Sequence, residues 1–256
     1  MKSYLTANYH AHTTRCKHAR GTEAEYIEAA IKAGIKQFGF SDHVPCPFKD
    51  GFVSGIRMGM EEAKDYVADI RRLQEEYRDR IELFVGFETE YMPQFFEEQM
   101  DMFRKLGCDY MIMGQLFLTG EKEGPYTGTP FSDEAFLKAY VDRIIEGMET
   151  GCFLYLAHPD IINYQGPEDI YEREMRRLCR RLKELNIPLE INLLGIHEGK
   201  QYPADRFWKI AGKVGNDVIF GIDAHWAELI GDAGDYEKGM ALVEKYHLHL
   251  IEKIDL

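Results

Sequence analysis

Short apolar runs recur along the chain and are separated by longer segments that mix apolar and polar residues. Most of the runs are continuous rather than alternating, which is typical of strands buried on both faces of a parallel sheet. We therefore expect the strands of such a sheet in SYLTANY (3–9), IKQFGFS (35–41), IELFVGF (81–87), YMIMGQLF (110–117), CFLYLA (152–157), IPLEINLL (187–194), DVIFGI (217–222) and LHLIEKI (248–254).

Between these runs, apolar residues recur every three or four positions, which is the period of a helix with one buried face. The clearest such segment is 22–34, which opens with Thr22 and Glu25 in the spacing of a capping box and stops at Gly34. The same period predicts further helices over 60–77, 133–151, 172–186 and 204–215.

Strands that alternate with helices predict an α/β fold in which helices cover a parallel sheet. Seven or eight such units favour a closed β/α barrel over an open, doubly wound sheet, which is the alternative. No linker rich in Pro, Gly or Ser interrupts the chain of 256 residues. We therefore predict a single domain over residues 1–256, with 118–133 as a long functional loop.

The composition is that of an ordinary globular protein, with 45% hydrophobic and 29% charged residues. No apolar run approaches the roughly 20 residues of a membrane span, and the first residues lack the apolar core of a signal peptide. We therefore expect a cytoplasmic protein with no membrane partner. The net charge of −13 disfavours nucleic acid as a partner, because binding to a phosphate backbone needs a basic surface.

The five cysteines are scattered and include no CxxC pair. Such a set is a poor disulfide framework and a poor thiolate metal site. We expect reduced cysteines, with Cys108 and Cys152 in the core.

Histidines and acids follow the ends of the predicted strands. Alternation along a strand puts His10 and His12 on one face, and the same spacing relates Asp223 and His225. In a barrel all the strand ends meet at one rim, where such enzymes carry out their chemistry. The residues at these ends are His10, His12 and His18, Asp42 and His43, Glu88, His158 and Asp160, and Asp223 and His225.

Imidazole and carboxylate donors without a thiolate suit Zn²⁺, Mn²⁺ or Fe²⁺. The donors outnumber what one ion needs, so we expect a cluster of two or three ions, which can activate water for phosphoryl transfer. The alternative is that each histidine is only a hydrogen-bonding residue at a strand end. His247 and His249 are interpreted in that way, because they follow a helical segment and lie in or beside the last run.

The ordered set of motifs resembles the polymerase and histidinol phosphatase (PHP) superfamily, and most of all its histidinol-phosphatase branch. The resemblance implies a distorted (β/α)₇ TIM-like barrel of the PHP type with a trinuclear metal site. It is carried by NYHAHTTRCKHARGT (8–22), GFSDHVP (39–45), IRM (56–58), GFETEY (86–91), AHPD (157–160), LEIN (189–192) and GIDAH (221–225).

The resemblance also implies which residues hold each ion. His10, His12, Glu88 and Asp223 would hold the first. Glu88 would bridge to a second ion, which takes His158 as a further ligand. His18, His43 and His225 would hold the third. The catalytic residues would be Asp223, Glu88 and His225.

The chain departs from the family pattern in the fourth strand. The family has a further His ligand for the second ion there, whereas this chain reads Gly114-Gln115-Leu116-Phe117. Neither Leu116 nor Phe117 can coordinate a metal, and Gln115 offers only an amide oxygen. We therefore expect that the second ion is held weakly or lost, or that water fills the place of the missing ligand. A smaller departure is Ile222, where the family usually has Ser.

Four cations lie near the predicted rim. Arg15, Lys17 and Arg20 lie in the first ligand loop, and Arg57 lies in a segment that the family uses near its substrate. Arg57, Arg15 and Lys17 are the candidate substrate-binding residues, and Arg57 is preferred because its segment, SGIRMG, has no other charge. The alternative for each is a solvated surface charge.

The resemblance predicts a metal-dependent phosphatase that hydrolyses L-histidinol phosphate, in histidine biosynthesis. The mechanism would be in-line attack on phosphorus by metal-activated hydroxide, with Asp160 or a metal-bound water as general acid. One alternative is a PHP phosphoesterase for another small phosphate ester or a nucleotide. Another is a metal-binding homologue with weak catalysis. Metal identity and oligomeric state do not follow from the sequence.

Overall fold

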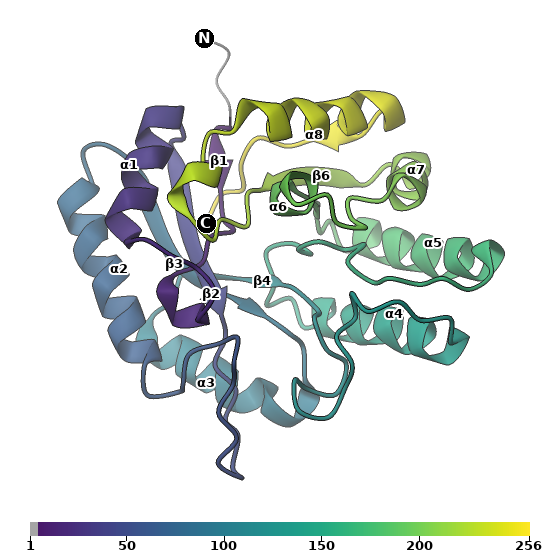
Figure 1. Ribbon diagram of the computed structural model, residues 1–256, viewed down its shortest axis with the longest axis horizontal. Helices are drawn as coiled ribbons and strands as arrows, with labels where there is room; N and C mark the ends of the chain where they lie inside the picture. Colours follow the sequence, from purple (N-terminus) through teal and green to yellow (C-terminus); the bar gives the residue numbers. More distant parts are fainter. Residues whose placement is uncertain (1–4) are drawn as a thin grey trace. The chain divides into compact units, whose positions relative to one another are not determined.

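The structure, a computed structural model, describes residues 5–256 (Figure 1). Ser3 and Tyr4, at the start of the first predicted strand, therefore lie outside the described residues. The chain divides into two compact units. Unit 1 comprises Met1–Ile112, Gly221–Ala233 and Glu252–Leu256, and unit 2 comprises Met113–Phe220 and Gly234–Ile251. The single domain over 1–256 stays a prediction.

Unit 1 is built on a four-stranded sheet in the order β1 (Ala7–Asn8), β2 (Gln37–His43), β3 (Glu82–Thr89) and β4 (Tyr110–Met113). β1 and β3 both pair with β2 in parallel. Figure 1 shows the helices of this unit along one side of the sheet. They are α1 (Glu23–Ala33), α2 (Ala63–Tyr77) and α3 (Pro93–Leu106). The unit also contains the short 3-10 helices η1 (Thr14–Cys16), after β1, and η2 (Ala227–Leu229), after β6.

Unit 2 contains a second sheet in the order β5 (Leu189–Asn192), β6 (Asp217–Gly221) and β7 (His249–Leu250). Leu156 forms isolated parallel bridges with Met113 and with Leu189. The helices are α4 (Glu134–Met148), α5 (Glu168–Glu184), α6 (Leu193–His197), α7 (Asp205–Val214) and α8 (Ala233–Tyr246). α5 packs against both α4 and α7.

The structure confirms the helices that were predicted from the spacing of apolar residues. α1 begins with the predicted capping box, in which the Thr22 side chain accepts from Glu25 N and the Glu25 carboxylate accepts from Thr22 N, and Gly34 ends it in a left-handed conformation. α2, α4 and α7 fall inside their predicted ranges, and α5 begins four residues before its range. The segment 118–133 has no helix, and its one strand-like contact is the Phe131 bridge to Tyr164.

Other expectations were wrong in part. The run 152–157 is not a strand and pairs only at Leu156. The run 187–194 ends as a strand at Asn192, because the Asn192 side chain accepts from Gly195 N and caps α6. The sequence did not indicate α3 or α6, and for α8 it indicated only a helical segment before His247, without bounds. Cys108 and Cys152 are only partly buried, whereas the cysteines in the core are Cys16, Cys46 and Cys179; all five are free.

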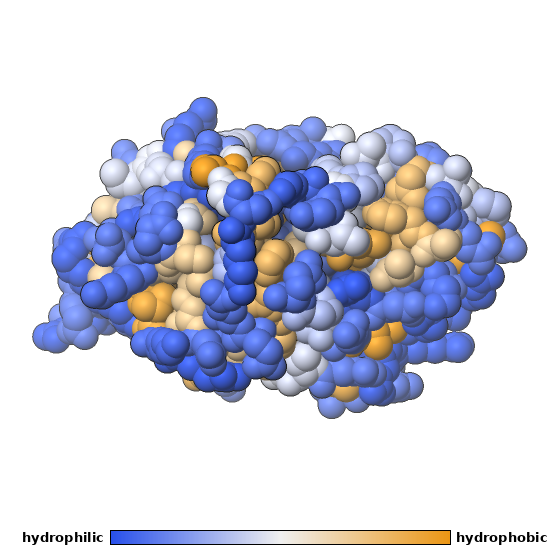
Figure 2. All heavy atoms as spheres, turned by 90° about the horizontal axis from the view of Figure 1, so that it is seen from below, coloured by the Kyte–Doolittle hydropathy of each residue, from blue (hydrophilic) through white to orange (hydrophobic). Residues whose placement is uncertain are grey.

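The surface carries many hydrophilic side chains, as the proportion of charged residues in the sequence leads one to expect. Figure 2 shows a face on which hydrophilic side chains predominate, with smaller hydrophobic areas between them. Among residues 5–256 no helix combines the length and the apolar character that crossing a membrane requires.

Close packing at the centre of unit 1 fixes the distance between β2, β3 and β4. The ring of Tyr110 lies against Gly39 and Gly86, where a side chain would overlap it. Its hydroxyl donates to the backbone oxygen of Tyr9 (2.7 Å). Two glycines therefore give the space for one buried tyrosine, which ties β4 to the segment that follows β1.

We predict that Gly86→Ala destabilises the protein by about 1–3 kcal/mol, because the new methyl group would overlap the backbone oxygen and ring of Tyr110. The free energy of unfolding in urea is the measurement. Gly55→Ala is the matched control, since no atom lies within 4 Å of a Cβ built there. Equal stability of the two variants would contradict the packing argument.

Candidate metal centre

The ends of the strands in unit 1 carry most of the predicted ligands. His10 and His12 follow β1, and β2 ends at His43. The register of β2 and β3 pairs His43 with Glu88. Asp223 and His225 follow β6, and a parallel bridge between Ala11 and Ala224 holds the two pairs side by side. Backbone hydrogen bonds from His12 N to Ala224 O (2.9 Å) and from Ala224 N to His10 O (3.3 Å) fix this register.

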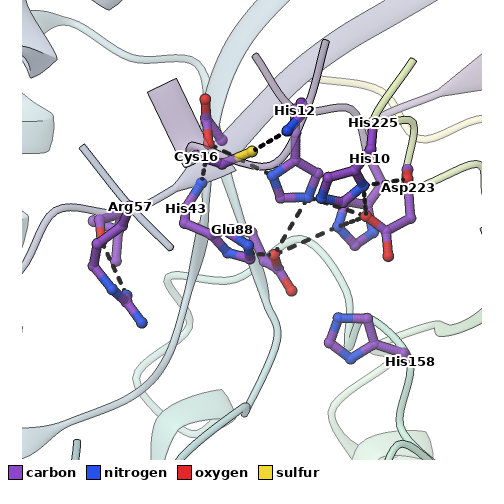
Figure 3. A network of polar contacts seen from close by, with 12 residues as sticks. His10, His12, Cys16, His43, Arg57, Glu88, His158, Asp223 and His225 are labelled. Atoms are coloured by element: carbon purple, nitrogen blue, oxygen red, sulfur yellow. Dashed lines mark hydrogen bonds and ion pairs between the residues drawn. The ribbon is translucent and has the colours of Figure 1, made fainter. Parts of the chain in front are cut away.

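Two buried carboxylates lie among these imidazoles (Figure 3). Asp223 Oδ1 is 3.0 Å from His12 Nε2 and 3.3 Å from His10 Nε2. Glu88 Oε2 is 3.6 Å from the Nε2 atoms of both His10 and His12. One potential ligand atom each from His10, His12 and Glu88 lies within 4.8 Å of the others. The structure thus brings together the four residues predicted for the first ion.

A second group of imidazoles comprises His18, His43 and His225, whose potential ligand atoms also lie within 4.8 Å of one another. The rings of His18 and His225 stack with centroids 4.6 Å apart. His225 Nδ1 contacts the backbone oxygen of Asp223 (2.9 Å), so Nδ1 carries the proton. His225 Nε2 is buried and has no hydrogen-bond partner in the described part of the chain. Such a nitrogen, with its lone pair directed into the site, fits a metal ion.

Burial and charge set the protonation of these rings. Burial alone would lower the pKa of His12, but hydrogen bonds with Asp223 and Asp42 and the charge of Glu88 outweigh it and raise the pKa to about 9. Burial lowers the pKa of His43 to about 4 and that of His225 to about 3. The cationic surroundings outweigh burial at Asp223 and lower its pKa well below the usual value.

Arg57 lies in the interior of unit 1. Its side chain is 1% exposed, and its guanidinium is 2.7 Å from Glu90 Oε2 and donates to Val44 O (3.1 Å). The alternative of a solvated surface charge is therefore wrong for Arg57. Together with Lys17 and the rings of Phe48 and Phe52, it lines a cavity of about 260 Å³.

The three cations of the first ligand loop have different surroundings. Arg15 forms ion pairs with Glu23 (2.9 Å) and Asp69 (2.6 Å). Lys17 is exposed and its ammonium donates to the backbone oxygen of Ser54. The guanidinium of Arg20 lies over the ring of Trp226, 5.1 Å from its centroid.

His158 and Asp160 belong to unit 2, and both are buried. His158 has a positive φ of 29°, and its backbone N–H donates to Glu190 Oε1 (3.3 Å). Burial raises the pKa of Asp160 to about 7, although Ala204 N donates to its Oδ2 (2.5 Å).

The fourth-strand segment, also in unit 2, offers no imidazole. Leu116 is buried, and Gln115 donates its amide to the backbone oxygen of Phe117 (2.6 Å). The assignment of His158, and the weakness of a second ion, therefore stay predictions.

No role was predicted from the sequence for two buried acids near the ligands. Glu90 pairs with Arg57, and Asp42 contacts both His12 and the backbone of His43. Asp42 was named among the strand-end residues, directly before a predicted ligand, but was assigned no contact or role. The partner of Arg57 had no local signal.

Comparison with known proteins gives consistent matches. The PHP domain family matches residues 8–193. A probable histidinol-phosphatase of Deinococcus radiodurans is 26% identical, covering 87% of each chain. The histidinol-phosphatase of Bacillus subtilis is 25% identical, covering 88% of this chain and 94% of that one. A crystal structure of the histidinol phosphate phosphatase of Lactococcus lactis, complexed with zinc, L-histidinol and phosphate, is similar with a TM-score of 0.74 at 18% identity, covering 98% of this chain and 99% of that chain.

At this identity the structural likeness shows the fold alone. It confirms the predicted fold class, an α/β fold of the PHP type with a distorted TIM-like barrel. The nitrogen and oxygen donors of the centre suit divalent metal ions.

We predict that the affinity for Zn²⁺ rises with pH. His12, with a pKa of about 9 in the metal-free protein, carries a proton at neutral pH that a metal ion must displace. The dissociation constant should fall about tenfold per pH unit between pH 6 and 8, measured by competition with a chelator. His43 and His225, with pKa values of about 4 and about 3, are already neutral there and add no slope. A constant affinity over this range would contradict the assignment of His12.

Proposed function

We propose that this chain, which belongs to the PHP domain family, is a metal-dependent phosphatase that hydrolyses L-histidinol phosphate to L-histidinol and phosphate. The observation that carries the proposal is the buried set of imidazoles around Glu88 and Asp223 in unit 1. The relatives named histidinol-phosphatase support the substrate. The Lactococcus lactis protein, which binds zinc, L-histidinol and phosphate, supports both the metal and the substrate.

The ligands follow from the two groups in unit 1. His10, His12, Glu88 and Asp223 would hold one ion, and His18, His43 and His225 another. His158 would serve a further ion that Glu88 shares, so the centre takes two or three ions of Zn²⁺, Mn²⁺ or Fe²⁺. Bound ions lower the pKa of water and neutralise charge on phosphoryl oxygens.

The chain's own residues would bind the ester and supply a proton. Lys17 and Arg57 line one cavity and are the candidates for contact with the phosphate, as is Arg15. Asp160 is the candidate general acid, because its pKa of about 7 leaves part of the population protonated at neutral pH. It would deliver that proton to the leaving alkoxide oxygen.

Phosphate release from L-histidinol phosphate is the direct test. The protein is reconstituted separately with Zn²⁺, Mn²⁺ and Fe²⁺, and kcat/KM is compared with that for an aryl phosphate and a nucleoside monophosphate. We expect a preference of at least about tenfold for L-histidinol phosphate. Equal or faster turnover of another ester would contradict L-histidinol phosphate as the substrate. If none of the esters were hydrolysed, the proposed phosphatase activity would be refuted.

Variants show whether turnover belongs to the proposed centre. His12→Ala and Asp223→Asn should reduce kcat at least about 100-fold, because each removes a metal ligand. His249→Ala is the matched control, since His249 is exposed and pairs with Asp217 (2.6 Å). Near-normal turnover in either ligand variant would refute the proposed site.

We predict that Lys17→Met raises KM for the ester about tenfold with little change in kcat, because it removes a cation that binds the phosphate in substrate and transition state alike. Lys17 suits this test better than Arg57, whose loss would leave Glu90 buried and uncompensated. Lys49→Met is the control, since Lys49 is an exposed lysine of the neighbouring segment. An unchanged KM in Lys17→Met would show that Lys17 is a solvated surface charge that does not bind the phosphate.

A further inference from the structure

Asp42 is a buried carboxylate that the proposed mechanism does not use. It has no exposed surface and stands directly before His43 at the end of β2. Burying a carboxylate is costly unless donors and cations surround it. The residues that contact Asp42 therefore indicate its role.

The two oxygens of Asp42 hold two different segments. Oδ2 accepts from Thr13 N (3.1 Å) and from the Thr13 hydroxyl. Oδ1 accepts from His43 N (2.8 Å) and lies 3.5 Å from His12 Nδ1. Asp42 N in turn donates to Tyr66 Oη (3.3 Å), whose hydroxyl donates to Gly86 O (3.0 Å). The backbone of Asp42 is thus tied to β3 through the hydroxyl of Tyr66, a residue of α2.

The contact with His12 selects one form of the imidazole. A carboxylate beside Nδ1 favours the proton on that nitrogen. When the ring is neutral, as metal binding requires, the lone pair is then on Nε2, which is the atom that lies 3.0 Å from Asp223 Oδ1 inside the centre. Carboxylates that act on metal-ligating histidines in this way fix the ring orientation and make the ligand more basic.

The contact with Thr13 extends to His18. Thr13 caps η1, because its side chain accepts from Arg15 N. η1 ends at Cys16, whose backbone oxygen contacts His18 Nδ1 (2.6 Å). One carboxylate therefore touches or anchors the segments that carry three imidazoles, His12, His18 and His43.

We propose that Asp42 is a positioning residue of the metal centre, which orients His12 through Nδ1 and fixes the turn that presents His18. This inference rests on the metal centre of the proposed function and is independent of the substrate.

The test is Asp42→Asn with Zn²⁺ alone as the probe. In either orientation of the amide, its NH₂ group faces a backbone donor, Thr13 N or His43 N, and the charge beside His12 is lost. We expect the dissociation constant for Zn²⁺, measured by chelator competition, to rise about 10- to 100-fold. The absorption spectrum of the Co²⁺-loaded protein should change as well, because the ligand geometry changes.

Asp109→Asn is the matched control. Asp109 also accepts from a backbone N–H, that of Val85 (2.8 Å), and pairs with Arg71 (2.7 Å) rather than with a predicted ligand. It should lose thermal stability while its affinity for Zn²⁺ stays within about twofold of the parent. Equal losses of Zn²⁺ affinity in both variants, or an Asp42→Asn affinity within about twofold of the parent, would overturn the proposal.

Thr13→Ala keeps the test decisive if Asp42→Asn does not fold. This change removes the hydroxyl that donates to Asp42 and caps η1, but leaves the contact with His12. We expect a smaller rise in the Zn²⁺ dissociation constant, about three- to tenfold. An unchanged dissociation constant would overturn the proposal. Since no substrate is present, failure to hydrolyse L-histidinol phosphate would leave this result untouched.

Discussion

The burial of two carboxylates among imidazole rings is the constraint on which unit 1 depends. Glu88 is 2% exposed and Asp223 is 5% exposed, and uncompensated charges in such places are strongly destabilising. In the metal-free chain the raised pKa of His12, about 9, keeps a cation beside both. In the proposed centre, a metal ion that displaced this proton would take over the compensation with a larger charge. Metal binding and folding would then be coupled through one charge balance.

The register of parallel strands makes this arrangement possible. β2 and β3 pair so that His43 stands beside Glu88, and the bridge between Ala11 and Ala224 sets the first ligand segment beside the last. A slip of one residue would turn each of these side chains to the opposite face. The backbone hydrogen bonds and the packing of Tyr110 thus keep the side chains of the proposed site in position and also stabilise the sheet.

Local signals allowed much of this to be predicted. The capping box of α1 and the histidines at strand ends are short-range patterns with direct physical causes, and the family match confirms the resemblance that the motifs indicated. Strand pairing is different, because it depends on available partners: the apolar run 152–157 pairs only at Leu156. The pairing of Arg57 with Glu90 joins residues far apart in sequence, and no local pattern encodes such a choice.

The ion pair of Arg57 with Glu90 also bears on the proposed centre. A buried ion pair contributes little net stability compared with apolar residues of the same size. Stability alone therefore does not explain why an arginine is buried at position 57. Its charge suggests a reason. Burial first, and then the charges of His12 and Arg57, lower the pKa of His43 to about 4. The guanidinium therefore adds, after burial and the charge of His12, to the effects that keep His43, a proposed metal ligand, neutral. The same positive charge, at the wall of a cavity shared with Lys17, would attract the anionic ester of the proposed function.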